Sequence, residues 1–200
     1  MLLTSFETWL PHQPFNSSDT LLEKLNDRWQ AGLSNPPCPY RLLRQLPVDS
    51  ARAMERIETA LGEMSVDEMP LEQTVPRLVV CCGMAEKRQT LDLEWQAFQE
   101  GHSLQTPLQL NALAEGLEPV ALSWDAGRFV CNSVYYRVLN LLMLAYPNTV
   151  GLFVHVPLLP PAQSVWDPQA LGILTAFELV LVRSYLHLTS PSGTPSIRES

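Results

Sequence analysis

Apolar positions along the chain follow two patterns: short continuous runs, and longer segments in which they recur every three or four residues. The continuous runs at 76–83 and 149–160 are rich in Val and Leu, which is typical of strands buried on both faces. Shorter runs predict further strands at 1–6, 40–48 and 119–125. Helical spacing predicts helices at 20–31, 49–64, 107–115, 131–146 and 167–186.

Capping residues mark where several of these helices begin and end. Thr20 and Glu23 fit a capping box for the first helix, and Gly32 is suited to its end. Asp167 followed by Pro168 predicts the start of the last helix, because proline is favoured in the first helical turn.

The segment 88–98 alternates between apolar and polar side chains, most clearly over 91–97, which predicts one half-exposed strand. The apolar face of this predicted strand holds Leu91, Leu93, Trp95 and Ala97. The polar face holds Asp92, Glu94 and Gln96.

Strands that alternate with helices at this spacing indicate an α/β fold: an open, mostly parallel twisted sheet with helices on both faces, in three layers. A chain of 200 residues suits one domain, which we place at residues 1–189. The polar segment 190–200 is expected to be a disordered tail.

Composition narrows the classes of function. A net charge of −8 argues against a nucleic-acid partner, since phosphate binding needs clustered Lys and Arg. No apolar run approaches the roughly 18 to 20 residues that span a bilayer, and the first residues lack a basic segment and a cleavage site. We therefore expect a soluble, cytoplasmic protein without a membrane partner.

The cysteines and glycines give no sign of a metal or cofactor. Cys38, Cys81, Cys82 and Cys131 form no C-x-x-C pair and are expected to be free thiols. Glycine-rich phosphate loops and closely spaced histidines are absent from the sequence. Any chemistry is therefore expected to come from side chains alone.

Three side chains have positions that suit catalysis. In open α/β sheets the functional crevice lies beyond the carboxyl ends of the strands, where loops lead into helices. Cys131 stands at such a helix start, where the helix dipole would lower its thiol pKa. His155 near the end of its strand would take the thiol proton, and Glu94 would fix the imidazole tautomer.

Each of these residues also has a purely structural interpretation. Cysteine is among the most buried residue types, so Cys131 would equally serve as apolar filler beside its helix. His155 would be a hydrogen-bonded core histidine, and Glu94 a solvated strand residue. Cys81 and Cys82 lie in the middle of a strand and are better explained by packing.

Several stretches in order along the chain resemble the type I pyroglutamyl peptidases, also called pyrrolidone-carboxylate peptidases. LLTSFETW resembles the opening L-x-T-G-F-x-P-F of that family, and RQLPVDSARA its second strand and helix start. VCCGMAEKRQTLDLEWQA resembles its G-Q-x-x-G-R segment leading to E-R-x-A. AGRFVCNSVYY and GLFVHVPLLP resemble A-G-x-[FY]-[VL]-C-N and G-F-[IV]-H-[VI]-P-[YF]-[IL]-P.

The resemblance implies a cysteine peptidase that removes an N-terminal pyroglutamyl or related group from peptides through a thioester. By motif position, Glu94, Cys131 and His155 match the catalytic glutamate, nucleophile and base of the family. The matched substrate pocket comprises Phe6, Trp9, Asn16, Met84, Phe129 and Val130. The family also implies homo-oligomers, and a peptide with a blocked or pyroglutamyl N-terminus as partner.

The chain departs from the family where the substrate is recognised. Met84 stands where the family has a glutamine, and methionine cannot replace an amide that both donates and accepts hydrogen bonds. Ser5, Thr8 and Trp9 replace a glycine, a proline and a phenylalanine. The family loop containing A-R-I-P-D-N is absent, and only FQEGHSLQT stands there. These departures leave an alternative open: a ligand-binding or regulatory protein with weak or altered hydrolase activity.

Overall fold

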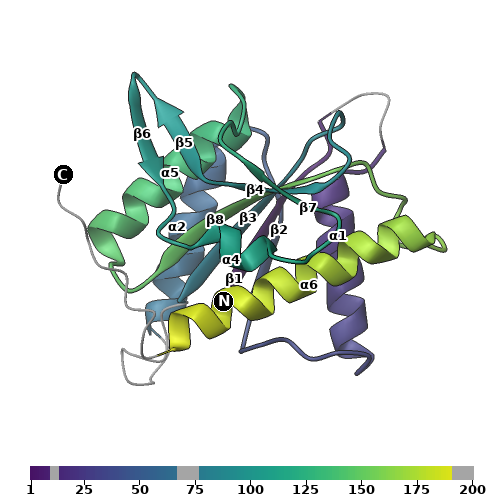
Figure 1. Ribbon diagram of the computed structural model, residues 1–200. Coiled ribbons are helices and arrows are strands. Elements are labelled where there is room, and N and C mark those ends of the chain that lie inside the picture. Colours follow the sequence, from purple (N-terminus) through teal and green to yellow (C-terminus); the bar gives the residue numbers. More distant parts are fainter. Residues whose placement is uncertain (10–13, 67–76, 191–200) are drawn as a thin grey trace.

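The protein is built on a six-stranded sheet with the strand order β2-β1-β3-β8-β4-β7, in a computed structural model that describes residues 1–9, 14–66 and 77–190 (Figure 1). The strands of this sheet are β1 (Leu2–Phe6), β2 (Arg41–Leu46), β3 (Leu78–Met84), β4 (Leu91–Glu94), β7 (Val120–Ser123) and β8 (Val150–Val156). Neighbouring strands are parallel except β4 and β8, which are antiparallel. The predicted open, mostly parallel α/β fold is confirmed.

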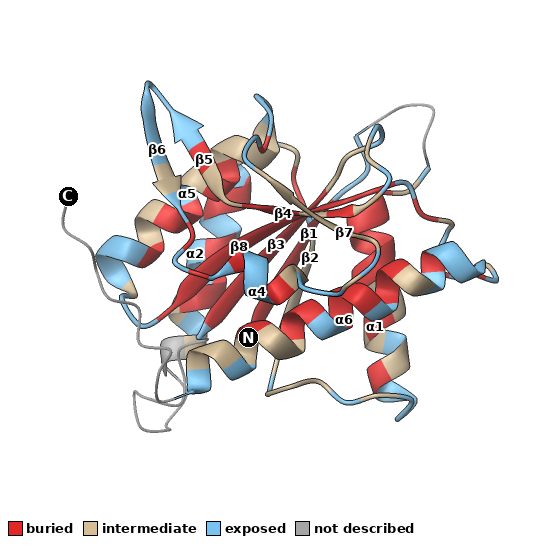
Figure 2. Cartoon of the chain, in the orientation of Figure 1, coloured by how far each residue is buried: buried red, intermediate tan, exposed pale blue. Residues whose placement is uncertain are grey.

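Helices cover both faces of the sheet, and each face has its own apolar core. The helices are α1 (Ser17–Gln30), α2 (Ser50–Val66), α4 (Leu110–Ala114), α5 (Val130–Ala145) and α6 (Pro168–Thr189). Apolar side chains of α1, α4 and α6 pack on one face, and those of α2 and α5 on the other. Figure 2 shows the central strands of the sheet as a buried layer between them, whereas the edge strands β2 and β7 are only partly buried.

The central strands β3 and β8 are buried along almost their whole length, as their continuous apolar runs predict. Their register pairs Gly83 with His155 and Met84 with Val156. Cys81 and Cys82 are both buried and belong to the apolar cores of opposite faces, which agrees with their expected role in packing.

Helix α1 begins earlier than predicted. Its N-cap is Asn16, whose side chain accepts a hydrogen bond from the backbone N–H of Ser18 at 3.0 Å. The predicted capping box at Thr20 is therefore wrong: an Asn-Ser-Ser sequence one turn upstream already supplies the preferred cap. Gly32 follows the end of the helix with a φ of +67°, as predicted.

The predicted single strand at 88–98 is also wrong. The strand β4 ends at Glu94, and beyond Trp95 the segment β5 (Gln96–Gln99) pairs with β6 (His102–Gln105) in a separate antiparallel hairpin. The turn residues Glu100 and Gly101 have φ values of +51° and +84°, the left-handed conformation that two-residue hairpin turns need. The next predicted helix is correspondingly reduced to the short α4.

Helix α6 contradicts the expectation that no apolar segment is long enough to span a bilayer. It has 22 residues and, by length and composition alone, could cross a membrane, a test that the core helix of a soluble protein also passes. Its N-cap Asp167 and first-turn Pro168 are as predicted, and Asp167 Oδ1 accepts the Ala170 N–H at 2.8 Å.

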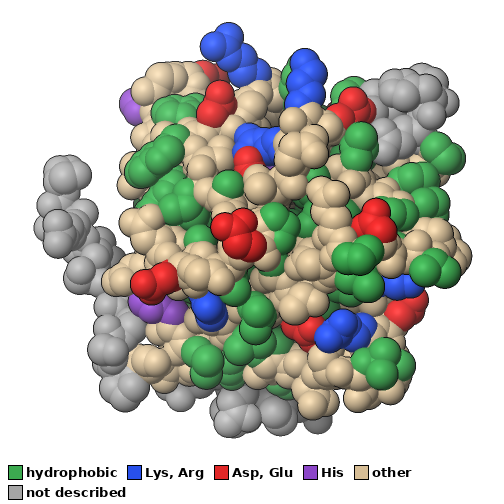
Figure 3. All heavy atoms as spheres, turned by 45° about the vertical axis from the view of Figure 1, so that its right-hand side comes forward, with side chains coloured by type: hydrophobic (Ala, Val, Ile, Leu, Met, Phe, Trp, Pro, Cys, Tyr) green, Lys and Arg blue, Asp and Glu red, His purple; other side chains and the backbone are tan. Residues whose placement is uncertain are grey.

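The expected disordered tail lies outside the described residues, save residue 190. On the face shown in Figure 3, Lys and Arg side chains are scattered among acidic and apolar ones.

Candidate active site

The predicted catalytic side chains share one face of the sheet. Side chains alternate along a strand, and Phe153 of β8 belongs to the core under α2 and α5, so His155 points to the same side. Leu91 and Leu93 of β4 belong to the opposite core, which directs Glu94 toward α5 as well. The first turn of α5, which carries Cys131, lies on this face.

Glu94 and His155 form a buried hydrogen-bonded pair. Glu94 Oε1 lies 2.6 Å from His155 Nδ1, and the two residues are 0% and 5% exposed. An ionised carboxylate can only accept, so Nδ1 carries a hydrogen, and in the neutral tautomer that this contact selects Nε2 is the acceptor. The alternative that Glu94 is a solvated strand residue is wrong, because β4 lies between β8 and β7 and Tyr135 of α5 reaches the Glu94 backbone carbonyl. The arrangement orients His155 to act as a base through Nε2.

Arg88 is a third member of this group that the sequence analysis did not single out. One of its guanidinium nitrogens lies 2.9 Å from Glu94 Oε1 and also pairs with Asp92. The other terminal nitrogen donates to the Asp125 carbonyl at 2.9 Å. The signal was present in the sequence, because Arg88 corresponds to the arginine that ends the G-Q-x-x-G-R segment.

Cys131 occupies the second position of α5, whose N-cap residue, Phe129, has no side-chain group able to accept a hydrogen bond. The first backbone N–H groups of the helix are thus left without a side-chain cap. The Cys131 sulfur lies against β3, only 2.8 Å from where a Cβ on Gly83 would stand. Because Gly83 pairs with His155 in register, the thiol lies close to the strand position of the imidazole.

Burial raises the pKa of the Cys131 thiol to about 12. A backbone hydrogen bond and Arg88 act to lower this pKa, whereas Glu94 and Cys81 raise it further. The predicted lowering of the Cys131 pKa by the helix dipole is therefore wrong, because loss of solvation outweighs the dipole. In the free protein the sulfur is a protonated thiol, and catalysis requires a base to remove its proton.

We expect Cys131 to react slowly with iodoacetamide near neutral pH, because the thiolate is the reactive form. Mass spectrometry of the alkylated peptides measures this rate, with the half-buried Cys38 in the same sample as internal reference. Faster labelling of Cys131 than of Cys38 at neutral pH would contradict it.

The glycine at position 83 is required for the close approach of the thiol to the sheet. A Cβ there would lie 2.8 Å both from Cys131 Sγ and from Cζ of the buried Phe153 ring, closer than side chains pack. Phe153 is fully enclosed and lies against the His155 ring at 4.9 Å between centroids. A side chain at position 83 would thus disturb both the nucleophile and the base.

We expect Gly83→Ala to lower the free energy of unfolding by about 1–3 kcal/mol through overpacking. It should also lower kcat/KM by about 100-fold, since small displacements of reacting groups have effects of that size. Gly62→Ala in α2 is the matched control, because a Cβ there meets no atom within 4 Å. Equal behaviour of the two variants in urea unfolding and kinetics would contradict the packing argument.

The residues predicted to bind substrate are divided between two places. Phe6 is buried in the core under α5, and Val130 packs against that core beside Cys131. Trp9 and Phe129 are 53% and 81% exposed. The structure therefore brings Phe6 and Val130 to the face that carries the thiol, with two exposed aromatic rings among the loops at the carboxyl ends of the strands.

Asn16 and Met84 are placed at the start of α1 instead. Strand alternation directs Met84 away from Cys131, and its sulfur accepts the Ser17 N–H at 3.5 Å. Asn16 caps α1 and donates to the Glu7 carbonyl at 3.1 Å. Phe6 and Asn16 nonetheless line one hollow at the carboxyl edge of the sheet, together with Glu7.

The β5–β6 hairpin occupies the place of the absent family loop and is attached directly to the nucleophile helix. Asn132, the neighbour of Cys131, accepts the Phe98 N–H at 2.9 Å and donates to the Phe98 carbonyl at 2.7 Å. Figure 1 shows the hairpin beside the first part of α5. The site is thus bordered by a short hairpin that contains no arginine.

A thiol at a helix start and an imidazole held by a buried carboxylate, on one face of an open α/β sheet, are the side chains of a cysteine-dependent hydrolase. Comparison with known proteins gives the family. The family described as "Pyroglutamyl peptidase" matches residues 107–177. A pyrrolidone-carboxylate peptidase of Enterococcus faecalis is 30% identical over 153 residues, which is 60% of this chain and 71% of the relative.

Other relatives extend the match over nearly the whole chain. A pyrrolidone-carboxylate peptidase of Yersinia pestis is 26% identical over 225 aligned positions, covering 94% of this chain and 96% of the relative. The crystal structure of pyroglutamyl peptidase I from Bacillus amyloliquefaciens has the same fold, with a TM-score of 0.70 at 20% identity, covering 94% and 95% of the two chains. The chain belongs to the pyroglutamyl peptidase family.

Proposed function

We propose that this protein is a cysteine omega-peptidase that removes an N-terminal pyroglutamyl residue from peptides. The observation that carries the proposal is the buried pair of Glu94 and His155, 2.6 Å apart, on the same face as Cys131 in a member of this family. A histidine with a purely structural role needs only a hydrogen-bond acceptor. A buried, ionisable carboxylate that holds the histidine on the same face as a thiol at a helix start is instead typical of a catalytic site.

In the proposed reaction His155 Nε2 takes the proton of the Cys131 thiol while the sulfur attacks the carbonyl carbon that joins the pyroglutamyl residue to the peptide. The first N–H groups of α5 stabilise the oxyanion of the tetrahedral intermediate. His155 returns the proton to the departing amine, leaving a thioester. Water, deprotonated by His155, hydrolyses the thioester and restores the thiol.

The lactam ring requires a small apolar pocket next to the sulfur. We assign its wall to Phe6 and Val130, since both belong to the core beside Cys131. Trp9 and Phe129 are assigned to its mouth because their rings are exposed. Asn16 and Met84 are assigned an indirect role, because both contact the start of α1.

A second function, binding of a ligand without efficient cleavage, is favoured by one observation. The hairpin that replaces the family loop supplies no arginine, and Met84 supplies no amide, so two polar contacts for a lactam are absent from this sequence. Loss of such contacts weakens discrimination by orders of magnitude while leaving the reacting groups in place.

Hydrolysis of a fluorogenic pyroglutamyl amide under reducing conditions tests the proposal, with the prolyl amide as the matched substrate that lacks the lactam carbonyl. Faster turnover of the pyroglutamyl amide is the expected result. Turnover of neither amide above the level of Cys131→Ala would refute the peptidase, and equal turnover of both would refute the pyroglutamyl specificity.

A further inference from the structure

Strand β4 carries two carboxylates on one face, Asp92 and Glu94, two residues apart. Their side chains are 14% and 0% exposed. Carboxylates buried side by side repel each other, and burial itself favours the protonated form. A compensating cation is therefore important here, because an added proton on the pair of Glu94 and His155 would remove its capacity to act as a base.

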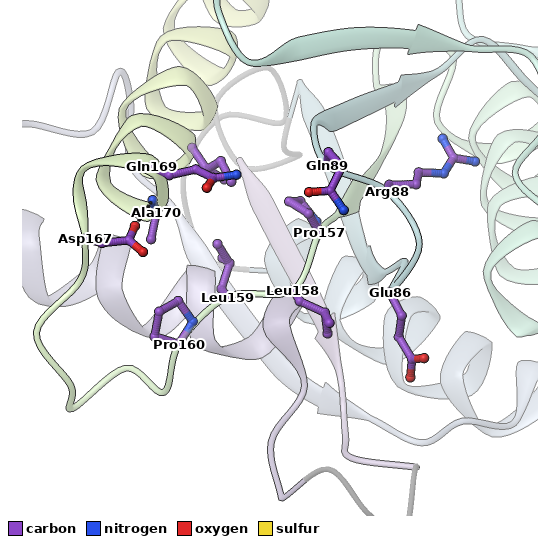
Figure 4. A pocket seen from close by; sticks show the side chains of 11 residues that line it. Glu86, Arg88, Gln89, Pro157, Leu158, Leu159, Pro160, Asp167, Gln169 and Ala170 are labelled. Carbon is purple, nitrogen blue, oxygen red and sulfur yellow. Dashed lines mark hydrogen bonds between the residues drawn. The ribbon is translucent and has the colours of Figure 1, made fainter.

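Arg88 is the cation that meets both carboxylates. It lies 2.9 Å from Glu94 Oε1, pairs with Asp92 through the same nitrogen, and is tied to the Asp125 carbonyl through the other. Arg88 also lines a hollow beside the start of α6, but Figure 4 shows its guanidinium pointing away from Leu158 and Leu159. Its charge is therefore directed at the carboxylates and not at a ligand in that hollow.

The other titratable groups on this face carry no compensating charge at neutral pH. Burial raises the pKa of Cys81 on β3 to about 11 and that of Cys131 on α5 to about 12, so both are neutral thiols. Burial also raises the pKa of Tyr135 on α5, and its neutral hydroxyl donates to the Glu94 backbone carbonyl at 2.9 Å. Among the described residues, Arg88 is the one cation that an ion pair links to Glu94.

We propose that Arg88 is a positioning residue that keeps the Glu94–His155 pair free of its extra proton at neutral pH, and so ready to accept the proton of Cys131. The inference rests on the proposed function in one respect, the assignment of His155 as the base. Because Arg88 is a cation in contact with Glu94, it stabilises the state in which the Glu94–His155 pair has a net negative charge. Removal of Arg88 should therefore move the formation of that state to higher pH.

The test compares Arg88→Gln and Arg88→Lys with the native protein, and uses Arg137→Gln on the exposed side of α5 as control. The rate of Cys131 alkylation by iodoacetamide and the rate of pyroglutamyl amide hydrolysis are measured from mildly acidic to mildly basic pH. Arg88→Gln should move the midpoint of the acid limb of both profiles upward by about one to three pH units. Arg88→Lys, which keeps the charge but not the fork of donors, should move it less, and Arg137→Gln should leave it in place.

Alkylation needs no substrate, so it separates this inference from the proposed function. If the native protein hydrolyses no pyroglutamyl amide but the alkylation limb still moves in Arg88→Gln, the substrate assignment fails and the role of Arg88 stands. An acid limb that stays in place while the rate or the thermal unfolding midpoint drops would mean that Arg88 is only structural. That result, or a downward shift, overturns the inference. If Arg88→Gln does not fold, Arg88→Lys alone decides by the same criteria.

Discussion

Replacing Cys131 by alanine is expected to abolish turnover of pyroglutamyl amides while the fold is retained. The thiol is the only proposed nucleophile, and removal of the nucleophile of a serine protease costs about 10⁶-fold in kcat. We expect a loss on the order of 10⁴-fold or more, down to the background of the assay. The thermal unfolding midpoint should change little, because Cys131 is only half-buried and alanine removes a single sulfur atom.

Cys38→Ala is the matched control, since Cys38 is also half-buried and lies at a distance from the site along the chain. It should keep full activity. The native protein and Cys131→Ala together separate the two proposed functions: a pyroglutamyl peptide that raises the unfolding midpoint of both equally, with no product formed by the native protein, favours ligand binding without cleavage. Retained turnover in Cys131→Ala would place the nucleophile elsewhere and contradict the assigned chemistry.

The sequence predicted the parts of the fold that local patterns determine. Continuous Val and Leu runs identified β3 and β8, and Asp167 with Pro168 identified the start of α6. Such signals are strong because each depends on a few neighbouring residues: a buried strand must be apolar on both faces, and a helix start needs a cap.

Long-range pairing explains what the sequence could not predict. Strand β4 is antiparallel to β8 and parallel to β7, and nothing in its own alternation indicates which neighbours it has. The alternation also continues through Trp95, where the chain leaves the sheet. There the Trp95 N–H bonds the Ser123 carbonyl at 2.8 Å, and its ring stacks on Trp124 with centroids 5.0 Å apart. The Trp95 carbonyl, however, accepts the Thr106 N–H at 3.0 Å, from the residue that follows β6, so the strand ends where pairing with a distant segment begins and not at a local turn signal.

In the candidate site, too, local motifs predicted some features, whereas others depend on contacts between distant segments. Motif positions identified Glu94, Cys131 and His155, and the structure places all three on one face. The shift of the Cys131 pKa was predicted in the wrong direction, because the sequence reveals the helix start but not the burial of the thiol. Arg88 was overlooked for a related reason: an arginine in a polar loop has many possible partners, and only the folded strand shows that it meets Glu94.

Glu94→Gln is expected to lower kcat/KM by about 10³- to 10⁴-fold, because the corresponding carboxylate-to-amide change in a serine protease triad costs about 10⁴-fold. Glutamine has the same shape, but its amide can donate to Nδ1, which selects the tautomer with the hydrogen on Nε2. It also provides no negative charge to stabilise the imidazolium that forms when His155 takes the Cys131 proton. KM should change little, because the carboxylate is fully buried and faces the imidazole.

Asp92→Asn is the matched control for this prediction, since Asp92 lies on the same strand and face and pairs with the same arginine. It removes one buried charge without touching His155, so we expect a loss of less than about 10-fold in kcat/KM, the scale of one indirect contact. A steady-state comparison of the two variants isolates the contact between Glu94 and His155. If both variants lost activity equally, the carboxylates would serve only to hold Arg88, and the orientation of His155 would have to depend on its packing against Phe153.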